Sequence, residues 1–307
     1  MIQILKHKPF EVIIIFLIAF LNLFWLPTFS FWDIYPKNFS FFKSSNLIEY
    51  KHPPKVYSKL SANPQLSSQH YVLLDAITNT IVLSQNKDNR IYPASTTKLI
   101  TALTALNIYP LDEEITIKEE YKEGKVMELK LDEKITIKSL VTALLVYSAN
   151  DSAFTLANHH QLGVIGFINE MNLIAQKYNL KNTHFTNFDG IHNENHYSTA
   201  YDLSQIARIA IKNPVVIETV KKKNIFVEDI DKTIKHELTS TNELLGIVPE
   251  IEGLKTGWTP EAGGSFIGLI NLNGHYLISV VAQSEDRFTD TKKIIDWAKG
   301  NVFWQTY

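Results

Sequence analysis

The sequence predicts an α/β (α+β) fold, in which an antiparallel sheet is packed with helices and an all-helical lobe lies beside it. Short apolar runs typical of strands stand near both ends of the globular part, at Tyr71–Asp75 and at Gly264–Asn271. Between them the chain has the longer apolar patterns of helices. A sheet assembled from such distant segments has the intervening helices inserted between its strands. We expect the functional site in the groove between sheet and lobe.

Composition excludes several classes of function. The chain has 307 residues and a formal net charge of -2, with 45% hydrophobic and 20% charged residues, which is ordinary for a globular protein. The chain has no excess of basic residues that would indicate a nucleic-acid partner. The absence of cysteine excludes disulfide frameworks, thiol nucleophiles and cysteine-ligated zinc.

The N-terminus predicts a membrane anchor. Val12–Trp32 is almost uninterruptedly apolar, follows Lys6 and Lys8, and is long enough to cross a bilayer. No small-residue cleavage site follows it, which favours an uncleaved anchor over a removed signal. Residues 1–32 are therefore expected to form a cytoplasmic tip and a single transmembrane segment, with the rest of the chain outside the cell membrane.

Two further parts follow the anchor. Residues 33–69 are rich in Ser, Pro, Asn and Lys without sustained periodicity, which predicts an extracytoplasmic stalk. Residues 70–307 are expected to form one catalytic domain.

The first half of that domain contains a predicted hairpin and two buried helices. Tyr71–Asp75 and Thr80–Ser84 are expected to pair as antiparallel strands. Lys98–Asn107 is apolar nearly all round, as a buried central helix would be, and Ser139–Tyr147 predicts a second buried helix. The charged residues 112–138 between these helices are expected to form a strand-like, solvated excursion.

The second half returns from helices to strands. Helices are predicted around 154–159, 165–178 and 200–211, and an amphipathic helix at 289–299 closes the domain. The strands Gly264–Asn271 and His275–Gln283 flank Asn273-Gly274, a dipeptide that favours a type I′ hairpin turn.

Ser95-Thr96-Thr97-Lys98 is the first candidate catalytic motif. It lies on the first turn of the buried helix, where residues three apart share one face, so the Ser95 hydroxyl and the Lys98 amine can meet. A lysine desolvated among apolar neighbours can lose its proton and serve as the base that a serine nucleophile needs. The positive helix N-terminus favours an oxyanion. Ser40-Phe41-Phe42-Lys43 has the same spacing, so the motif alone decides nothing.

Two more motifs follow in chain order. Ser148-Ala149-Asn150 comes directly after the second buried helix, and only its position distinguishes it from Ser61-Ala62-Asn63 and Ser240-Thr241-Asn242. Lys255-Thr256-Gly257 occurs once and is expected on an edge strand. There a lysine and a hydroxyl can bind a carboxylate, while the glycine permits close approach of backbone to a ligand.

Together these three motifs resemble those of the penicillin-recognising serine peptidases, specifically the low-molecular-mass D-alanyl-D-alanine carboxypeptidases with their β-lactamase/transpeptidase-like fold. The resemblance extends over Tyr71–Phe303. It includes Tyr92-Pro93-Ala94 before the serine, the stretch His196–Leu203, and the stretch Gly253–Gly263.

The resemblance implies an acyl-enzyme mechanism on peptidoglycan stem peptides that end in D-Ala-D-Ala, with β-lactams as covalent inhibitors. Ser95 would be the nucleophile and Lys98 its base. Ser148 would relay a proton to the leaving amine, and Asn150 would orient the substrate amide. No metal or organic cofactor is implied.

The same resemblance assigns the edge strand to substrate binding. Lys255 and Thr256 would bind the terminal carboxylate, and Gly257 would allow the strand to approach. The backbone N–H groups of Ser95 and Trp258 would form the oxyanion hole.

Alternatives remain open from the sequence. A D,D-endopeptidase on cross-linked peptidoglycan shares every motif. A class A β-lactamase needs a glutamate for deacylation, and neither Glu170, Glu194 nor Glu243 stands in the expected context. A non-catalytic cell-wall binding protein would not need all the catalytic residues. His159-His160 is interpreted as solvated helix surface rather than a metal site, and His196 as either structural or near the cleft.

Overall fold

The structure is a computed structural model and describes residues 53–56 and 62–304. The predicted anchor at 1–32 lies outside these residues, as does most of the predicted stalk. Within the described ranges, no helix combines the length and the apolar character that crossing a bilayer requires.

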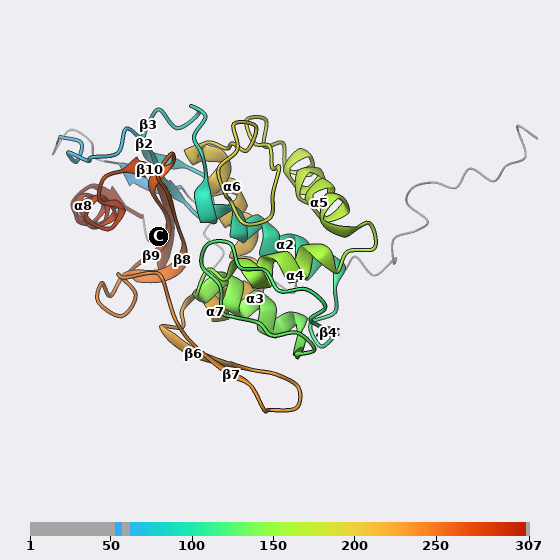
Figure 1. The fold of residues 1–307 in the computed structure, drawn as a ribbon. Coiled ribbons are helices and arrows are strands. Elements are labelled where there is room, and N and C mark those ends of the chain that lie inside the picture. The colour runs from blue at the N-terminus through green and yellow to red at the C-terminus, as the bar shows by residue number, and fades with distance from the viewer. Residues whose placement is uncertain (1–52, 57–61, 305–307) are drawn as a thin grey trace, which may run out of the picture. The chain divides into compact units, whose positions relative to one another are not determined.

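A five-stranded antiparallel sheet organises the domain, as the sequence predicts (Figure 1). Its strand order is β3-β2-β10-β9-β8. The bounds are β2 His70–Asp75, β3 Ile81–Gln85, β8 Ile251–Thr259, β9 Gly263–Leu272 and β10 His275–Ser284. Because β2 pairs with β10, the two ends of the domain meet in the middle of the sheet.

The predicted turn between the last two strands is confirmed. Leu272 pairs with His275, which leaves Asn273-Gly274 as a two-residue loop. Asn273 has φ 55° and Gly274 has φ 89°, and positive φ at both central positions is the requirement of a type I′ turn.

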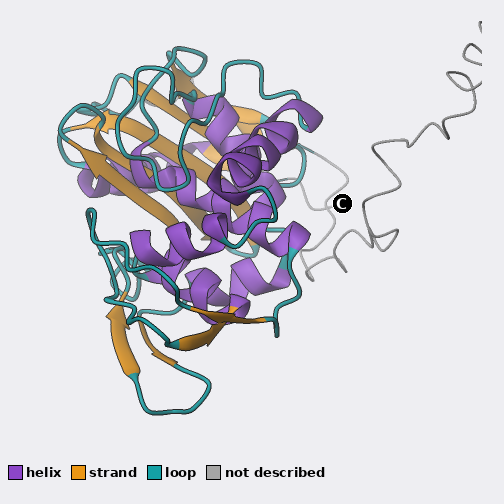
Figure 2. Cartoon of the chain, turned by 45° about the vertical axis from the view of Figure 1, so that its right-hand side comes forward, coloured by secondary structure: helices purple, strands orange, loops and turns teal. Residues whose placement is uncertain are grey.

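The sheet separates one helix from all the others (Figures 1 and 2). The helices are η1 Ala94–Thr97, α2 Lys98–Ile108, α3 Ile137–Val146, α4 Asn150–Asn158, α5 Gly163–Lys177, α6 Ala200–Ala210, α7 Pro214–Val220 and α8 Arg287–Asn301. Helix α8 packs on one face of the sheet, whereas α6 packs on the other and α2 to α5 form the lobe behind it. Helix α2 is buried all round from Lys98 to Ala105, as its sequence predicts.

Apolar side chains fill both faces of the sheet. Along β2, Val72 and Leu74 join the core shared with the helical lobe, while Tyr71 and Leu73 join the core beneath α8. Successive side chains of a strand point to opposite faces. A sheet covered on both faces therefore requires continuous apolar strands, which explains the unbroken runs in the sequence.

The strand-like reading of residues 112–138 is wrong for most of the segment. Only β4, Glu114–Thr116, and β5, Lys134–Thr136, pair as strands. Between them the backbone N–H groups of Met127 and Leu129 donate to the Asp151 carboxylate of α4 rather than to a neighbouring strand. A buried carboxylate thus replaces a strand partner and holds this segment on the helical lobe.

The structure also contains elements that the sequence interpretation missed. Helix α7 has Pro214 at its first turn after the capping side chain of Asn213, a signal typical of a helix start. The hairpin of β6, Asn224–Glu228, and β7, Lys235–Thr239, has the alternating burial of a half-covered pair of strands and projects beyond the lobe (Figure 1). Two short strands pair beside α8, β1 Lys55–Val56 and β11 Val302–Phe303.

Candidate active site

Ser95 and Lys98 meet at the start of the buried helix. Ser95 lies in the 3₁₀ turn η1, and the α-helix begins at Lys98, the first residue of the predicted range. Side chains three apart eclipse in a 3₁₀ turn, so the pair still shares one face. Lys98 Nζ lies 3.0 Å from Ser95 Oγ.

Lys98 is fully buried, and the only other hydrogen bond of its Nζ among the described residues is donated to the backbone carbonyl of Asp189 at 2.8 Å. Burial lowers the pKa of Lys98 from its ordinary 10.5 to about 8, although the negative charges of Asp189 and Asp151 oppose the change. An amine with this pKa is partly unprotonated near neutral pH. Lys98 can therefore accept the proton of Ser95.

Asp189 is a site residue that the sequence interpretation missed. It is 2% exposed, its Oδ2 accepts a 3.0 Å hydrogen bond from Tyr121 Oη, and its backbone holds Lys98. The next residue, Gly190, has φ 88°, and a Cβ there would lie 1.9 Å from the carbonyl oxygen of Ala94. Only glycine lets this loop support the turn that carries Ser95.

A second serine–lysine pair joins the lobe to the sheet. Ser148 follows α3 with φ 70°, and Lys255 lies on β8. Lys255 Nζ donates to Ser148 Oγ at 2.8 Å and to the Thr256 carbonyl at 3.0 Å. Burial lowers the pKa of Lys255 well below its ordinary value, and the positive charges of Lys98 and Lys125 lower it further. The two motifs are therefore parts of one site.

Asn150 is the first residue of α4 rather than part of a loop. Its Nδ2 donates to the Glu123 carbonyl at 2.9 Å, and its backbone N–H donates to the Lys125 carbonyl at 2.7 Å. A Cβ on Gly124 would lie 2.4 Å from Nδ2. The charged segment around Gly124, for which the sequence suggests no role, thus forms one wall of the site.

Strand β8 forms the opposite wall and is an edge strand, as predicted. A Cβ on Gly257 would lie 3.0 Å from the backbone nitrogens of Ser95 and Thr96, so the glycine allows the strand to approach Ser95. Thr256 Oγ1 lies 2.6 Å from Thr241 Oγ1. Trp258 is 61% exposed beside them.

Arg287 is the second missed residue. It begins α8, and its positive charge contributes to the lowered pKa of Lys255. Its Nε is buried without a hydrogen-bond partner in the part of the chain that the structure describes. A Cβ on Gly264, the β9 partner of Trp258, would lie 3.5 Å from Arg287 Cβ. No local motif marks this arginine, because it lies 32 residues after Lys255 in the chain and comes near it only in the folded domain.

The histidines that the sequence singles out are structural. His196 is buried, accepts a 3.1 Å hydrogen bond from the Thr186 N–H at Nδ1, and lies 2.8 Å from Thr97 Oγ1 through Nε2. Nδ1 is therefore the acceptor, and Nε2 carries the proton donated to Thr97. His159 is not solvated surface as expected, because its Nε2 lies 2.6 Å from Glu113 Oε1 at the start of β4.

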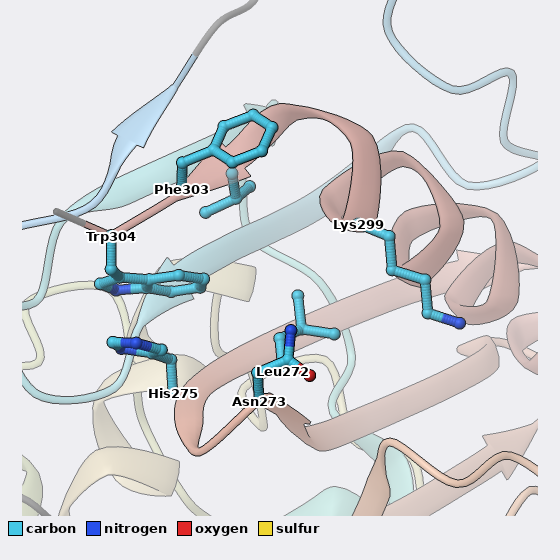
Figure 3. A pocket seen from close by; sticks show the side chains of 7 residues that line it. Leu272, Asn273, His275, Lys299, Phe303 and Trp304 are labelled. Carbon is cyan, nitrogen blue, oxygen red and sulfur yellow. The ribbon is translucent and has the colours of Figure 1, made fainter. Parts of the chain in front are cut away.

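A separate cavity of about 320 Å³ lies at the opposite end of β9 and β10 (Figure 3). The ring of His275 stacks on that of Trp304 at 4.2 Å, and Leu272, Phe303 and Lys299 lie around them. None of the three catalytic motifs contributes to this cavity.

Comparisons with known proteins identify the relatives of this chain. The sequence profile of the D-alanyl-D-alanine carboxypeptidases matches residues 57–286. The carboxypeptidase DacA of Haemophilus influenzae is 31% identical over 78% of this chain, which spans 63% of the relative's length. The carboxypeptidase of Streptomyces sp. strain K15 is 32% identical over 72% of this chain and 83% of its own.

Solved structures agree with the sequence comparison. The crystal structure of the Streptomyces K15 DD-transpeptidase superposes with a TM-score of 0.72 and 29% identity, covering 78% of this chain and all of that one. A penicillin-binding protein homologue from Mycobacterium tuberculosis, at 24% identity and a TM-score of 0.74, shares the fold. The chain belongs to the D-alanyl-D-alanine carboxypeptidase family.

Proposed function

We propose that this protein is a serine-type D-Ala-D-Ala carboxypeptidase that removes the terminal D-alanine from peptidoglycan stem peptides. Ser95 Oγ attacks the carbonyl carbon of the scissile amide while its proton passes to Lys98 Nζ. The tetrahedral intermediate collapses with cleavage of the C–N bond, and Ser148 passes a proton to the leaving D-alanine amine. Water then hydrolyses the ester on Ser95 and releases the shortened peptide.

The observation that carries this proposal is the presence of two buried serine–lysine pairs in one site. Lys98 lies 3.0 Å from Ser95, and Lys255 lies 2.8 Å from Ser148. Burying two lysine side chains in one site is costly for stability, which indicates that they serve another purpose. One serine needs a base and the other a proton source, so the two pairs fit the two halves of an acyl transfer.

The terminal carboxylate of the substrate fits the cationic wall beside Ser95. Lys255 and Arg287 supply positive charge there, and Thr256 supplies a hydroxyl. Arg287 has the planar donor group that binds carboxylates in a bidentate manner. The backbone N–H groups of Ser95 and Trp258 are proposed to stabilise the oxyanion.

Release of D-alanine from a stem pentapeptide by the full chain in detergent tests the assignment. Wild-type protein is expected to release D-alanine and to be labelled covalently by a fluorescent penicillin. Ser95→Ala is expected to lose both while keeping the thermal unfolding midpoint of the wild type. A Ser95→Ala variant that still releases D-alanine would refute the mechanism.

Transpeptidation is the second candidate, because a similar solved protein is described as a DD-transpeptidase. The two reactions share the acyl-enzyme and differ only in whether water or an amine attacks the ester. Adding an amine acceptor such as glycylglycine to the pentapeptide assay separates them. A transpeptidase would form the ligated peptide at the expense of the hydrolysed one. Cross-linked muropeptides in the same assay test the endopeptidase alternative.

We further propose that the protein is a single-pass protein of the cell membrane with its catalytic domain outside the cytoplasm. The proposal rests on the apolar run Val12–Trp32, the lysines before it, and the location of peptidoglycan. Fractionation of cells that express the full chain, followed by protease treatment of intact spheroplasts, tests it. The catalytic domain is expected in the membrane fraction and should be degraded from outside.

A further inference from the structure

We infer that Lys125 forms a second anion subsite in the cleft, which selects stem peptides with a free carboxylate on the acyl side of the scissile bond. This inference rests on the proposed carboxypeptidase function and concerns the substrate class of the same site. The sequence motifs assign no role to Lys125, because it lies outside all three of them.

The backbone fixes Lys125 next to Asn150. The Asn150 N–H donates to the Lys125 carbonyl at 2.7 Å, and the preceding Gly124 has no room for a Cβ beside the Asn150 amide. The segment therefore cannot shift without moving Asn150. Asn150 is expected to orient the substrate amide, and Lys255 and Arg287 are assigned to the leaving-group side, so we place Lys125 on the acyl side.

The side chain of Lys125 is positioned by an aromatic ring. Its Nζ lies 4.0 Å from the centroid of the Tyr147 ring, and Tyr147 directly precedes Ser148. A cation–π contact of this kind orients an ammonium group without neutralising its charge. The ammonium remains available to an incoming anion.

Two neighbouring lysines of the same segment form ion pairs, whereas Lys125 forms none with a described residue. Lys122 pairs with Glu120 at 2.7 Å and Lys130 pairs with Glu128 at 3.7 Å. Lys125 has no carboxylate within 4.0 Å among the residues that the structure describes. Lys118, Lys134 and Lys138 of residues 112–138 also have no described carboxylate within 4.0 Å, but it is Lys125 whose backbone carbonyl binds the Asn150 N–H.

The site also holds more positive charge than one substrate carboxylate can neutralise. Lys98 must be neutral to act as a base, while Lys255 and Arg287 face the terminal carboxylate on the leaving-group side. Lys125 is close enough to lower the pKa of Lys255, so it adds positive charge to the same cleft. A substrate that brings a second carboxylate on the acyl side relieves this repulsion as well as pairing with Lys125.

Two peptides that differ in one group test the inference. Both end in D-Ala-D-Ala after a diamino-acid residue, whose side-chain carboxylate is free in one peptide and amidated in the other. Their kcat/KM values for D-alanine release are compared in wild type, Lys125→Met and Lys125→Arg, with Lys122→Met as the matched control from the same segment.

We expect wild type and Lys122→Met to prefer the free carboxylate by about tenfold, which is the range of a charge-assisted hydrogen bond at a partly exposed site. Lys125→Met should lose the preference, because its kcat/KM falls more for the free-carboxylate peptide than for the amidated one. Lys125→Arg should retain the preference, because it keeps the charge.

Several results would overturn the inference. Equal rates on the two peptides in wild type, or a preference that survives in Lys125→Met, would remove the subsite. An equal loss on both peptides in Lys125→Met would show that Lys125 only supports Asn150. Hydrolysis of both peptides in these cases leaves the proposed function intact, whereas hydrolysis of neither by wild type overturns the proposed function and the inference together.

Discussion

Lys255 Nζ and Ser148 Oγ lie 2.8 Å apart although 107 residues separate them in the chain. One belongs to the edge strand of the sheet and the other to the turn between α3 and α4. The hydrogen bond therefore joins the sheet to the helical lobe, in the same site as the Ser95–Lys98 pair. Because the two side chains are in direct contact, we expect them to act as one unit.

Ser148→Ala and Lys255→Met are expected to lower kcat/KM for D-alanine release by about a hundredfold each, because either change interrupts proton transfer to the leaving amine. The double variant should lose little more than the more damaging single one, since residues that act as a unit are not additive. Losses that multiply in the double variant would contradict this coupling. Lys292→Met, an exposed lysine of α8, is the control.

Asp189→Asn is expected to shift the pH profile of kcat/KM. Activity requires neutral Lys98, whose pKa of about 8 is held up by the negative charge of Asp189. Removing that charge lowers the pKa of Lys98, so activity should rise with pH about one unit earlier than in wild type.

The profile is measured as the acylation rate by a penicillin between pH 5 and pH 9. Asp132→Asn, an exposed aspartate in a turn before β5, should leave the profile unchanged. An unmoved profile in Asp189→Asn, or one moved to higher pH, would show that Asp189 does not tune Lys98 by its charge.

Gly257→Ala is expected to slow acylation of Ser95 by about a hundredfold. The new methyl group would lie 3.0 Å from the Ser95 nitrogen and push β8 away from the proposed oxyanion hole. Gly300→Ala is the matched control, because nothing lies within 4 Å of a Cβ there and the residue is helical. It should keep full activity and gain about 0.5–1 kcal/mol of stability. Equal acylation rates in the two variants would contradict this prediction.

His196 is expected to make the domain less stable in acid. Burial lowers its pKa from 6.5 to about 3, so the unfolded chain binds a proton that the folded chain excludes. Stability is therefore complete above pH 6.5 and is lost progressively as the pH falls towards 3.

Between pH 7.5 and pH 5, wild type should lose about 2 kcal/mol more unfolding free energy than His196→Gln, which keeps a donor for Thr97 but does not titrate. Urea unfolding at the two pH values measures the difference. Identical losses in the two proteins would show that His196 is not buried in its neutral form.

Much of the fold could be predicted from local pattern. The apolar run of α2, the Asn273-Gly274 turn and the two hairpins of the sheet were all predicted because each depends on residues that are close in sequence. The segment 112–138 was not, because its order comes from the distant carboxylate of Asp151. Backbone N–H groups that donate to this carboxylate need no strand partner. The pattern of apolar residues in the segment gives no sign of that interaction.

The residues of the candidate site fall into the same two groups, those predictable from local sequence and those brought together by the fold. The sequence alone predicts which side chains supply the chemistry, since Ser95 and Lys98 are three residues apart and Ser148 directly follows a recognisable helix. Only the tertiary structure decided that Lys98 is buried against Asp189, that Gly124 and Gly190 support the site, and that Arg287 and Lys125 bring charge to it. These features arise from contacts between segments far apart in the chain. Burial and electrostatic coupling depend on distance in space, which the order of residues does not specify.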